Sequence, residues 1–497
     1  IFEAMELQSI AELLDLKALL LFLLAFLLIA DFLKNRNPPN YPPGPFALPF
    51  AGNVFSASFK QPHIYLKELH KAYGNIFGFR LGAEKVVCLT GYKMVKEALV
   101  VKGDNFVDRP FSAIADRLYP GSSGLFFSNG NKWKRQRRFT LSTLRNFGLG
   151  KTTLEVAICE ESRCLLEAME SQKGDAFDPS DLFIKAVGNI ICQLVFGQRY
   201  DYSDHTFQRM LNLSSDLFKL QASIYEAFPG IMKRLPGPHN DIFTHYDLIS
   251  NFIRKEVNRH KDNFDPANPR DYIDAFLTEM KENPQNVAEG FYESNLIMNS
   301  LDMFSAGTET TSTTLRWALL ILMKYPDIQE KVQAEIDSVI GQSRPPNMSD
   351  RPNLPYTDAV IHEIQRRGNI IPLNAPRMAS KDTALGGYII PRGTTLFTDL
   401  TSVLFDESEW ETPESFNPSH FLDAEGRFRK PEAFIPFSAG KRACLGEQLA
   451  RMEIFLFFVS LFQKFRFSTQ EGTELSLEGT YGIAHVPHPF KIYAHVR

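Results

Sequence analysis

This chain has no grouped cysteines and little tryptophan, and neither positive nor negative charge is in large excess. Its five cysteines are scattered, odd in number and form no Cys-x-x-Cys pair: Cys88, Cys159, Cys164, Cys192 and Cys444. This pattern argues against a disulfide framework and indicates a reducing compartment. It also leaves no cysteine cluster for an iron–sulfur centre. The net charge of −4 over 497 residues argues against non-specific binding to nucleic acid.

Dinucleotide-binding motifs and internal repeats are missing as well. No Gly-x-Gly-x-x-Gly sequence opens a βαβ unit, so the chain has no recognisable site for a nicotinamide or flavin of its own. Beyond residue 46 there is no second shift in composition and no low-complexity segment. With 44% hydrophobic residues, the chain can form one large domain with a large core.

A long apolar run occupies the N-terminal region. Residues 18–30 are unbroken apolar sequence, and extension to residues 13–33 gives a segment long enough to cross a bilayer. The longer segment admits Asp15, Lys17 and Asp31. A cleaved signal peptide is the alternative, but no small-x-small cleavage site follows the run. We therefore predict an uncleaved membrane anchor.

The flanking charges predict how this anchor is oriented. Acidic residues precede the run, whereas Lys34 and Arg36 follow it, so the positive-inside rule places the bulk of the protein in the cytosol. The proline-rich stretch that comes next disfavours helix and central strand and is typical of a stiff linker. The predicted organisation is an anchor over residues 1–36, a hinge over 37–45 and one globular domain over 46–497.

Hydrophobic periodicity predicts a mainly α-helical chain with a small β portion, an α+β class. Helical patterns cover residues 64–71, 92–101, 133–141, 154–169, 179–196, 207–218, 271–281, 292–324, 326–340, 355–367 and 444–464. β-type runs cover residues 86–89, 396–404, 465–467 and 483–496.

Residues 434–450, FIPFSAGKRACLGEQLA, place one cysteine between a glycine-containing loop and an apparent helix. Gly440 permits a sharp turn, and Gly446 leaves no side chain where a flat ligand could lie. A thiol ahead of a helix start faces unpaired N–H groups and the positive end of the helix dipole, which favour the metal-binding thiolate. Arg442 adds a cation that can pair with a carboxylate, and Phe437 keeps the surroundings apolar.

Cys444 alone has a simpler explanation, because a lone intracellular cysteine usually acts as a small buried hydrophobe. Zinc is disfavoured, since no second cysteine or histidine stands at ligand spacing. The whole stretch around Cys444 instead favours a one-cysteine iron site.

A basic segment provides the second candidate element. Trp133 and Arg137 are four residues apart and share a helix face, which suits clamping one anionic group. A solvated basic face is the alternative. Further charges would form a basic surface suited to an acidic protein partner: Lys132, Lys134, Arg135, Arg138, Arg145 and Lys441.

Residues 306–311, AGTETT, lie inside a long apolar helix and form the third element. Threonine is a poor helix former, and the Thr310 hydroxyl can bond the carbonyl of Ala306 one turn back, which would bend or open the helix. Gly307 would clear space for dioxygen and a water, with Glu309 and Thr310 relaying protons. A polar stripe inside a core helix is the alternative.

The cysteine stretch resembles the haem-binding signature of the cytochrome P-450 superfamily through the pattern Phe437-x-x-Gly440-x-Arg442-x-Cys444-x-Gly446. The resemblance extends over nearly the whole chain and is closest to family 2, in particular its J-like vertebrate subfamily. It implies the cytochrome P-450 fold, with haem b between a long central helix and the cysteine loop. Cys444 would be the axial thiolate ligand.

The resemblance also implies roles for the other elements. Glu309 and Thr310 match the acid–alcohol pair that delivers protons to bound dioxygen. Propionate binding would rest on four residues: Trp133, Arg137, Arg377 and Arg442. Further haem contacts would come from Ala306, Gly307, Phe437, Gly440 and Gly446. The segment 120–123, where relatives offer another arginine, is Pro-Gly-Ser-Ser.

Glu363 and Arg366 lie three residues apart on one helix face, an arrangement that contributes little when it is exposed. In the superfamily such a pair is buried and shapes the cysteine loop. Its third partner would be His420, at a place where an arginine is usual.

Family 2 members are endoplasmic-reticulum monooxygenases that act on fatty acids and foreign lipophiles. The resemblance therefore implies hydroxylation or epoxidation of polyunsaturated fatty acids such as arachidonate, and of xenobiotics. Electrons would come from a membrane-bound NADPH-dependent flavin reductase, with cytochrome b5 as a further partner. The domain would face the cytosol from the endoplasmic reticulum membrane.

The substrate pocket implied by the resemblance is largely apolar: Phe111, Leu125, Phe126, Phe304, Ala306, Ile371, Ala375 and Ile483. The apolar stretch 217–235 would dip into lipid, with core packing as its alternative. Two other classes of function stay open, namely a haem-thiolate isomerase or dehydratase that rearranges peroxides, and a non-catalytic haem sensor or carrier. The pair Glu309–Thr310 speaks against the isomerase.

Overall fold

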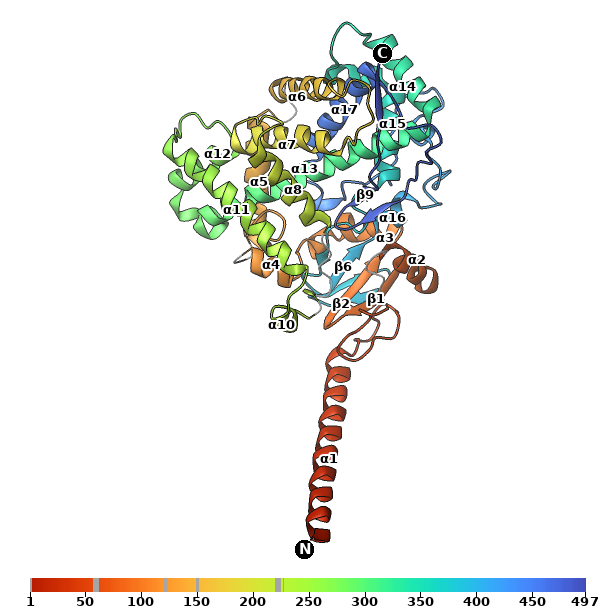
Figure 1. Ribbon diagram of the computed structural model, residues 1–497. Helices are drawn as coiled ribbons and strands as arrows, with labels where there is room; N and C mark the ends of the chain where they lie inside the picture. The colour runs from red at the N-terminus through yellow and green to blue at the C-terminus, as the bar shows by residue number, and fades with distance from the viewer. Residues whose placement is uncertain are drawn as a thin grey trace.

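The computed structural model describes residues 2–56, 62–119, 121, 123–148, 152–219, 225–226 and 228–497, with side chains from residue 16 onward. A mostly helical body carries one long helix that projects from it (Figure 1). The mainly α class with a small β portion is confirmed. Predictions at Pro120, Ser122, Ile224 and residues 149–150 lie outside the described residues.

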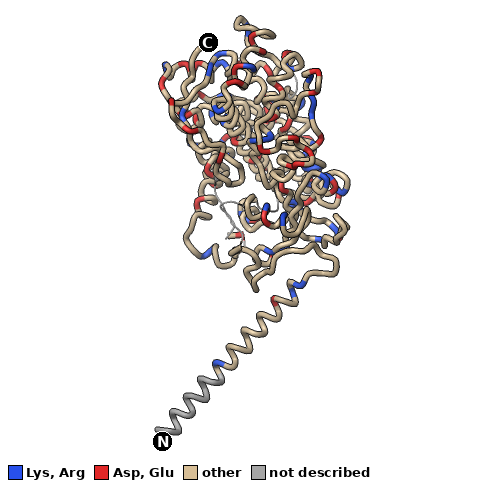
Figure 2. Tube along the Cα trace, turned by 90° about the vertical axis from the view of Figure 1, so that its right-hand side faces the viewer, with Lys and Arg blue, Asp and Glu red and all other residues tan. Residues whose placement is uncertain are grey.

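The projecting helix is α1, Phe2–Asn35, and its part Leu16–Asn35 is long and apolar enough to cross a membrane, with no residue of that part packed inside the protein. Its described part carries charge only near its two ends (Figure 2). Asp31, which seemed out of place in an apolar segment, pairs with Arg80 at 3.3 Å and accepts the N–H of Phe50 at 3.2 Å. This ion pair ties the end of α1 to the sheet of the globular body.

The centre of the body is α13, Glu293–Lys324, a 32-residue helix that is buried along most of its length. It packs against α7 (Ser180–Phe196), α11 (His239–Asp262), α15 (Pro355–Gly368) and α17 (Glu447–Lys464). A helix enclosed on all sides is apolar around its whole circumference, so polar residues on α13 need a specific reason. The remaining helices are α2 Pro62–Tyr73, α3 Tyr92–Lys96, α4 Ala113–Leu118, α5 Gly130–Asn146, α6 Thr152–Glu170, α8 His205–Lys219, α10 Pro229–Met232, α12 Tyr272–Glu282, α14 Pro326–Val339 and α16 Leu400–Leu404.

The largest sheet has four strands in the order β1-β2-β6-β3 and lies where α1 joins the body (Figure 1). Only β2 and β6 run parallel; the other neighbours are antiparallel. These strands are β1 Ile76–Leu81, β2 Glu84–Leu89, β3 Arg377–Met378 and β6 Thr395–Thr398. Three two-stranded sheets pair β4 Thr383–Leu385 with β5 Tyr388–Ile390, β7 Phe465–Ser468 with β10 Tyr493–Val496, and β8 Gly479–Tyr481 with β9 His485–Pro487.

Each predicted helical pattern coincides with a helix, but several predictions were wrong in detail. Residues 400–404 are helix α16, not strand, because the Asp399 side chain accepts the N–H of Thr401 and caps a helix start. The run 483–496 is two short strands, since Pro487 and Pro489 cannot donate to a ladder. Helix α11 was not predicted at all, although its buried residues recur at helical spacing.

Candidate functional site

The cysteine loop is held by its backbone. A short 3-10 helix, Gly440–Arg442, precedes Cys444, and Gly446 is the N-cap of α17. The N–H of Cys444 donates to the carbonyl of Phe437 at 2.9 Å. Gly440 has φ +73°, and a Cβ there would collide with the carbonyl oxygen of Leu99, so only glycine fits this turn. A Cβ at Gly446 would lie 4.0 Å from the sulfur of Cys444, an ordinary contact, so packing within the protein does not by itself require glycine there.

The Cys444 sulfur is reachable from an adjoining hollow, yet protein surrounds it on most sides. That burial raises the pKa of the thiol, while N–H groups of Gly446 and Glu447 and the charge of Arg137 lower it. Burial wins, so the expected preference for thiolate is wrong for the metal-free protein. A bound metal cation reverses this balance, because a coordinating thiol is deprotonated.

Four arginines converge beside this loop. Arg442 stacks on the Trp133 ring at 3.9 Å from its centre and donates to the carbonyl of Val107 at 2.9 Å. Arg137, on the same face of α5 as Trp133, donates to the carbonyl of Ala443 at 2.6 Å. Arg377 donates to the carbonyl of Arg442 at 3.2 Å. The predicted four-residue clamp is therefore assembled in one place.

The fourth arginine, Arg109, was missed by the sequence analysis. It donates to the carbonyls of Ala375 at 2.9 Å and Pro376 at 2.6 Å and joins the cluster from the segment before α4. A lone arginine before a proline carries no pattern of its own in the sequence. Only the fold brings it to the others.

The cluster is electrostatically unfavourable without an anion. Burial, followed by repulsion from other arginines, lowers the pKa of Arg377 to about 8. The pKa values of Arg109 and Arg442 fall to about 9 for the same reasons. Arg377 Nε has no hydrogen-bond partner among the residues that the structure describes. Buried charges of one sign need a counter-charge, and the two propionates of haem supply one of the right sign.

The largely buried middle part of helix α13 is exposed at one turn. Ala306 is exposed and Gly307 and Thr310 are half-buried, although the helix around them is buried. The Thr310 hydroxyl donates to the carbonyl of Ala306 at 2.7 Å, as predicted. The helix nonetheless continues through this turn without interruption, so the predicted opening is not a break in the backbone. Glu309 is 3% exposed.

Helix packing, and not the open space that was predicted, explains why residue 307 is a glycine. A Cβ at this position would lie 2.5 Å from Cδ1 of Ile191 in α7. The space beside Gly307 is therefore filled by Ile191, and glycine permits the close packing of α7 on α13. The open surface of this turn lies instead at Ala306 and Thr310.

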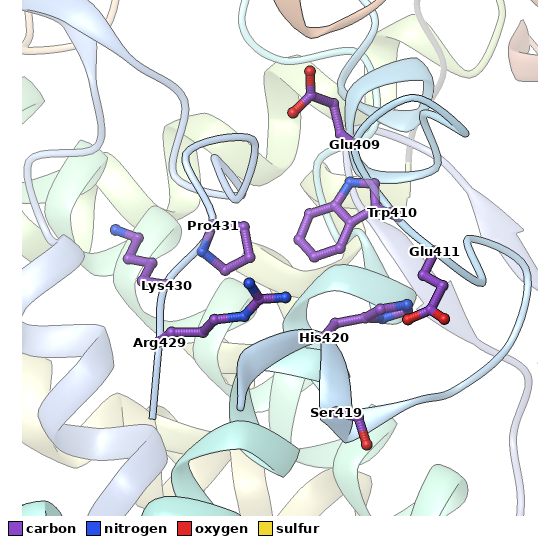
Figure 3. Close-up of a pocket in the computed structure, with 8 residues that line it drawn as sticks. All are labelled: Glu409, Trp410, Glu411, Ser419, His420, Arg429, Lys430 and Pro431. Carbon is purple, nitrogen blue, oxygen red and sulfur yellow. The ribbon is translucent and has the colours of Figure 1, made fainter. Parts of the chain in front are cut away.

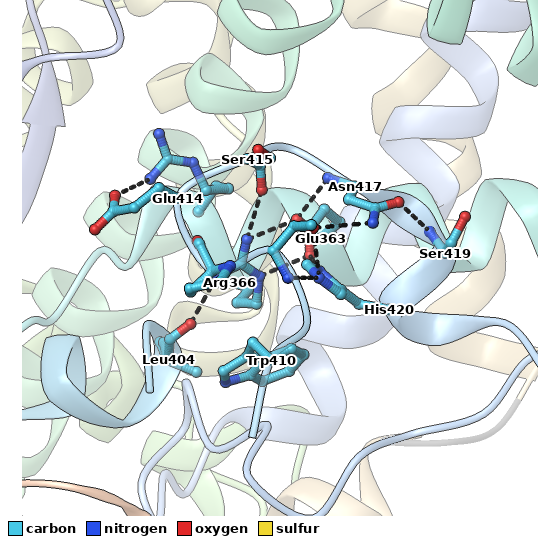
Figure 4. A network of polar contacts seen from close by, with 12 residues as sticks. Glu363, Arg366, Leu404, Trp410, Glu414, Ser415, Asn417, Ser419 and His420 are labelled. Carbon is cyan, nitrogen blue, oxygen red and sulfur yellow. Dashed lines mark hydrogen bonds and ion pairs between the residues drawn. The ribbon is translucent and has the colours of Figure 1, made fainter. Parts of the chain in front are cut away.

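The predicted buried pair is present, and His420 joins it (Figure 4). Glu363 and Arg366 are both fully buried and form two hydrogen bonds of 2.8 Å. Arg366 also donates to the carbonyls of Leu404 and Ser415, each at 2.8 Å. His420 lies 3.3 Å from Glu363, so histidine takes the arginine's place in the network. The network pins residues 404–420 to α15.

A hollow of about 300 Å³ lies outside this network (Figure 3). Trp410 and His420 form part of its wall, and the guanidinium of Arg429 points between Pro431 and His420. Trp410 also lies against the guanidinium of Arg366 at 5.2 Å. The hollow is thus next to the supporting network and distinct from the cysteine loop.

The predicted substrate residues are only partly brought together. Arg109 links Phe126 and Ala375 by bonding both carbonyls, and Leu125 adjoins Phe126. Phe304, by contrast, is 1% exposed and packs against Phe196, so it belongs to the core. The others stand at different depths: Phe111 and Ile483 are exposed, and Ile371 is half-buried. The exposed Ile231 and Leu235 show that the stretch 217–235 is not packed into the core throughout.

The predicted basic surface is smaller than expected. Arg135 pairs with Glu289, and Lys441 pairs with Asp104. Lys132 donates to the carbonyl of Gly121 at 2.8 Å. Exposed charge without an ion pair among the described residues remains at Lys134, Arg138 and Arg145. Arg145 lines a hollow of about 300 Å³ together with Cys444 and Arg451, so this charge adjoins the cysteine.

A single accessible cysteine at a helix start, a buried cationic cluster and a bared polar turn define a protein that holds haem through a thiolate. The chain belongs to the cytochrome P450 family, whose model matches residues 42–494. It is 50% identical to Cytochrome P450 2J2 of Homo sapiens and to Cytochrome P450 2J1 of Oryctolagus cuniculus, each over 96% of both chains. Cytochrome P450 2B4 of Oryctolagus cuniculus is 43% identical over 95% of this chain. The protein is a P450 monooxygenase of family 2, near the J subfamily, as the sequence motifs indicated.

The Glu363–Arg366 pair generates a stability prediction. Glu363→Ala leaves a buried guanidinium without its counter-charge, which should lower the free energy of unfolding by about 3–5 kcal/mol. Denaturant unfolding measures this change. Glu414→Ala is the matched control, because Glu414 is exposed and lies 3.9 Å from the neighbouring Arg367; it should cost about 0–1 kcal/mol. Equal effects would show that burial of the first pair does not matter.

The arginine cluster generates a salt prediction for the haem-free protein. Burial and repulsion from Arg109 and Arg137 disfavour the charged form of Arg377 and so lower its pKa, yet a guanidinium keeps its proton in proteins. Salt screens like charges, so the free energy of unfolding should rise with NaCl concentration. Arg377→Met should reduce that rise in urea unfolding, whereas Arg429→Met, outside the cluster, should not. An undiminished rise in Arg377→Met would contradict the repulsion.

Proposed function

We propose that the chain is a membrane-anchored monooxygenase that hydroxylates or epoxidises lipophilic substrates, with Cys444 as the iron ligand. The observation that carries the proposal is the position of Cys444 beside the buried Arg109, Arg377 and Arg442 and the half-buried Arg137, none of which forms an ion pair among the described residues. When bound, haem supplies dioxygen activation, and thiolate ligation favours O–O cleavage.

Different residues would bind the haem and handle the proton. Arg109, Arg137, Arg377 and Arg442, with the indole of Trp133, neutralise and orient the propionates. Gly440 and Gly446 keep the loop open beside the sulfur. On the other face, Ala306 leaves a small surface, and the Thr310 hydroxyl stands at the carbonyl of Ala306, where it can hold or pass a proton. Glu309 is the acid that refills it.

Proton delivery by Glu309 and Thr310 favours monooxygenation over isomerisation of a peroxide or haem storage, since neither rival needs added protons. The electrons must come from another protein, because the sequence has no nicotinamide or flavin motif. We infer an NADPH-dependent flavin reductase, with cytochrome b5 as a second donor. Arg145 is exposed and lines a hollow together with Cys444, and Arg138 is exposed on the same helix, so both provide cationic groups for an acidic partner.

Lipophilic substrates fit the exposed aromatic side chains of Phe111 and Phe126. Polyunsaturated fatty acids such as arachidonate, and xenobiotics, are the proposed classes. Substrates of this kind partition into membranes, and α1 would keep the domain at one. Ile231 and Leu235 are apolar and exposed, which suits contact with lipid. We propose the endoplasmic reticulum membrane, with the domain in the cytosol.

Thr310→Ala tests the proton-delivery role. In the reconstituted system with reductase, product formed per NADPH should fall about tenfold or more, and hydrogen peroxide should rise, because the hydroxyl that would hold and pass the proton at this turn is gone. Thr313→Val, which removes another buried hydroxyl of α13, is the control and should leave the yield unchanged. Omitting the reductase should abolish product formation. Unaltered yield in Thr310→Ala would refute the assignment.

A further inference from the structure

An acidic residue lies inside the apolar part of α1. The segment Leu16–Asn35 is long and apolar enough to cross a membrane, and Asp31 stands four residues before its end. At a rise of 1.5 Å per residue, Asp31 lies about 6 Å from that end, near the border between hydrocarbon and headgroups. Ionisable residues are rare and costly in membrane-spanning segments, and they usually serve a function together with a specific partner.

The partner of Asp31 belongs to the globular body, which α1 meets beside β1 and β2 (Figure 1). Both Nη atoms of Arg80, in β1, lie 3.3 Å from Oδ2 of Asp31, and the N–H of Phe50 donates to the same oxygen at 3.2 Å. The side chains of Arg80 and Asp31 are 8% and 12% exposed, so the ion pair is buried. Arg80 also donates to the carbonyl of Leu48 at 2.5 Å. One guanidinium therefore joins the helix, the loop before β1 and the sheet.

The chain that connects α1 to the body is short. Helix α1 ends at Asn35. The carbonyl of Asn40 already accepts the N–H of Ile389, in β5, at 2.8 Å, and the carbonyl of Pro43 accepts the N–H of Gly78, in β1, at 2.8 Å. Only four residues separate Asn35 from Asn40, and two of them are prolines. The direction of α1 relative to the body therefore depends on these four residues and on the buried ion pair.

Exposed apolar side chains surround the ion pair. Phe46, Leu48 and Phe50 are 83%, 45% and 48% exposed. Single exposed apolar residues are ordinary, but three within five residues, beside the end of a membrane-spanning segment, indicate contact with lipid. Lys34 and Arg36 follow the apolar segment, and cations at this position are attracted to anionic headgroups. The surface next to Asp31 therefore has the composition expected of a bilayer contact.

We propose that the Asp31–Arg80 ion pair is a latch that fixes the direction of the catalytic domain relative to α1 and holds residues 46–50 against the bilayer. Without the latch, α1 would still cross the membrane, but the domain would turn about the four connecting residues. Loss of either partner also leaves the other charge buried without a counter-charge. The proposal rests on the membrane anchorage proposed above, and it adds which surface of the domain meets lipid.

Quenching of tryptophan fluorescence by lipid tests the position of residues 46–50 in the full-length protein. The native Trp133, Trp317 and Trp410 are at most 4% exposed, so a tryptophan introduced by Phe46→Trp is the one that lipid can reach. In phosphatidylcholine vesicles with bromine in the upper acyl chains, Phe46→Trp should lose emission, and the protein without this substitution should not. Absence of quenching in protein that floats with the vesicles would overturn the proposal. Protein that does not float would refute the anchorage, and the latch with it.

Variants of the ion pair then test the latch itself. In the Phe46→Trp background, Asp31→Leu and Arg80→Met should each lose quenching, and the exchange of Asp31→Arg with Arg80→Asp should regain part of it. Lys96→Met, which breaks the exposed pair Lys96–Glu432, is the control and should leave quenching unchanged.

Folding of the body is checked separately by haem content. Asp31 belongs to α1 and not to the globular body, so Asp31→Leu should keep normal haem content even if Arg80→Met reduces it. Undiminished quenching in Asp31→Leu would overturn the latch, although the protein floats and binds haem. Loss of quenching in Asp31→Leu with normal haem content, and its partial return in the charge exchange, is the result that the latch predicts.

Discussion

The repulsion among Arg109, Arg137, Arg377 and Arg442 is the constraint on which the site depends. Burial lowers the pKa of all four, and repulsion from other arginines lowers it further for Arg109, Arg377 and Arg442, so the fold holds positive charge where water screens it poorly. These guanidinium groups donate hydrogen bonds to carbonyl oxygens of several segments and so fix the segments to one another. The cluster is unfavourable alone and favourable around a dianion, so folding of the site and haem binding are coupled.

Other parts of the structure keep the cysteine loop beside this cluster. Gly440 allows the turn that carries the loop under Leu99, and the start of α17 directs N–H groups at the sulfur of Cys444. The Glu363–Arg366–His420 network fixes residues 404–420 to α15, outside the haem contacts. Helix α13 is largely buried, and in its middle part Ala306 is exposed while Gly307 and Thr310 are half-buried. The site therefore combines two kinds of surface: a cationic one beside the ligating cysteine, and a small polar one on α13.

Sequence motifs predicted the parts of the site that lie close together in the chain. Trp133 with Arg137, Ala306 with Thr310, and Glu363 with Arg366 each occupy one helix, so helical spacing was enough to relate them. Arg109 was not predicted, because its proximity to Arg377 and Arg442 arises only from long-range packing. The role of Gly307 was misjudged for the same reason, since Ile191 comes from another helix. Helix α11 and the cap at Asp399 show that element boundaries depend on tertiary contacts and single side-chain bonds.

Ion pairs between residues distant in the chain could not be predicted from the sequence either. Lys441 and Arg135 looked free in the sequence, yet partners distant in the chain neutralise them, and the cationic surface near Cys444 contracts to a few residues. Glu453, in contrast, drew no notice in the sequence because it stands alone among apolar residues. It accepts a hydrogen bond from the Thr311 hydroxyl, which comes from a different helix.

The central claim is that Cys444 binds haem iron as a thiolate, and the carbon monoxide difference spectrum of the reduced protein tests it most directly. The wild-type protein should give the red-shifted Soret band of thiolate-ligated haem, and Cys444→Ser should lose that band. A wild-type spectrum without it, in protein that contains its full amount of haem, would contradict the account.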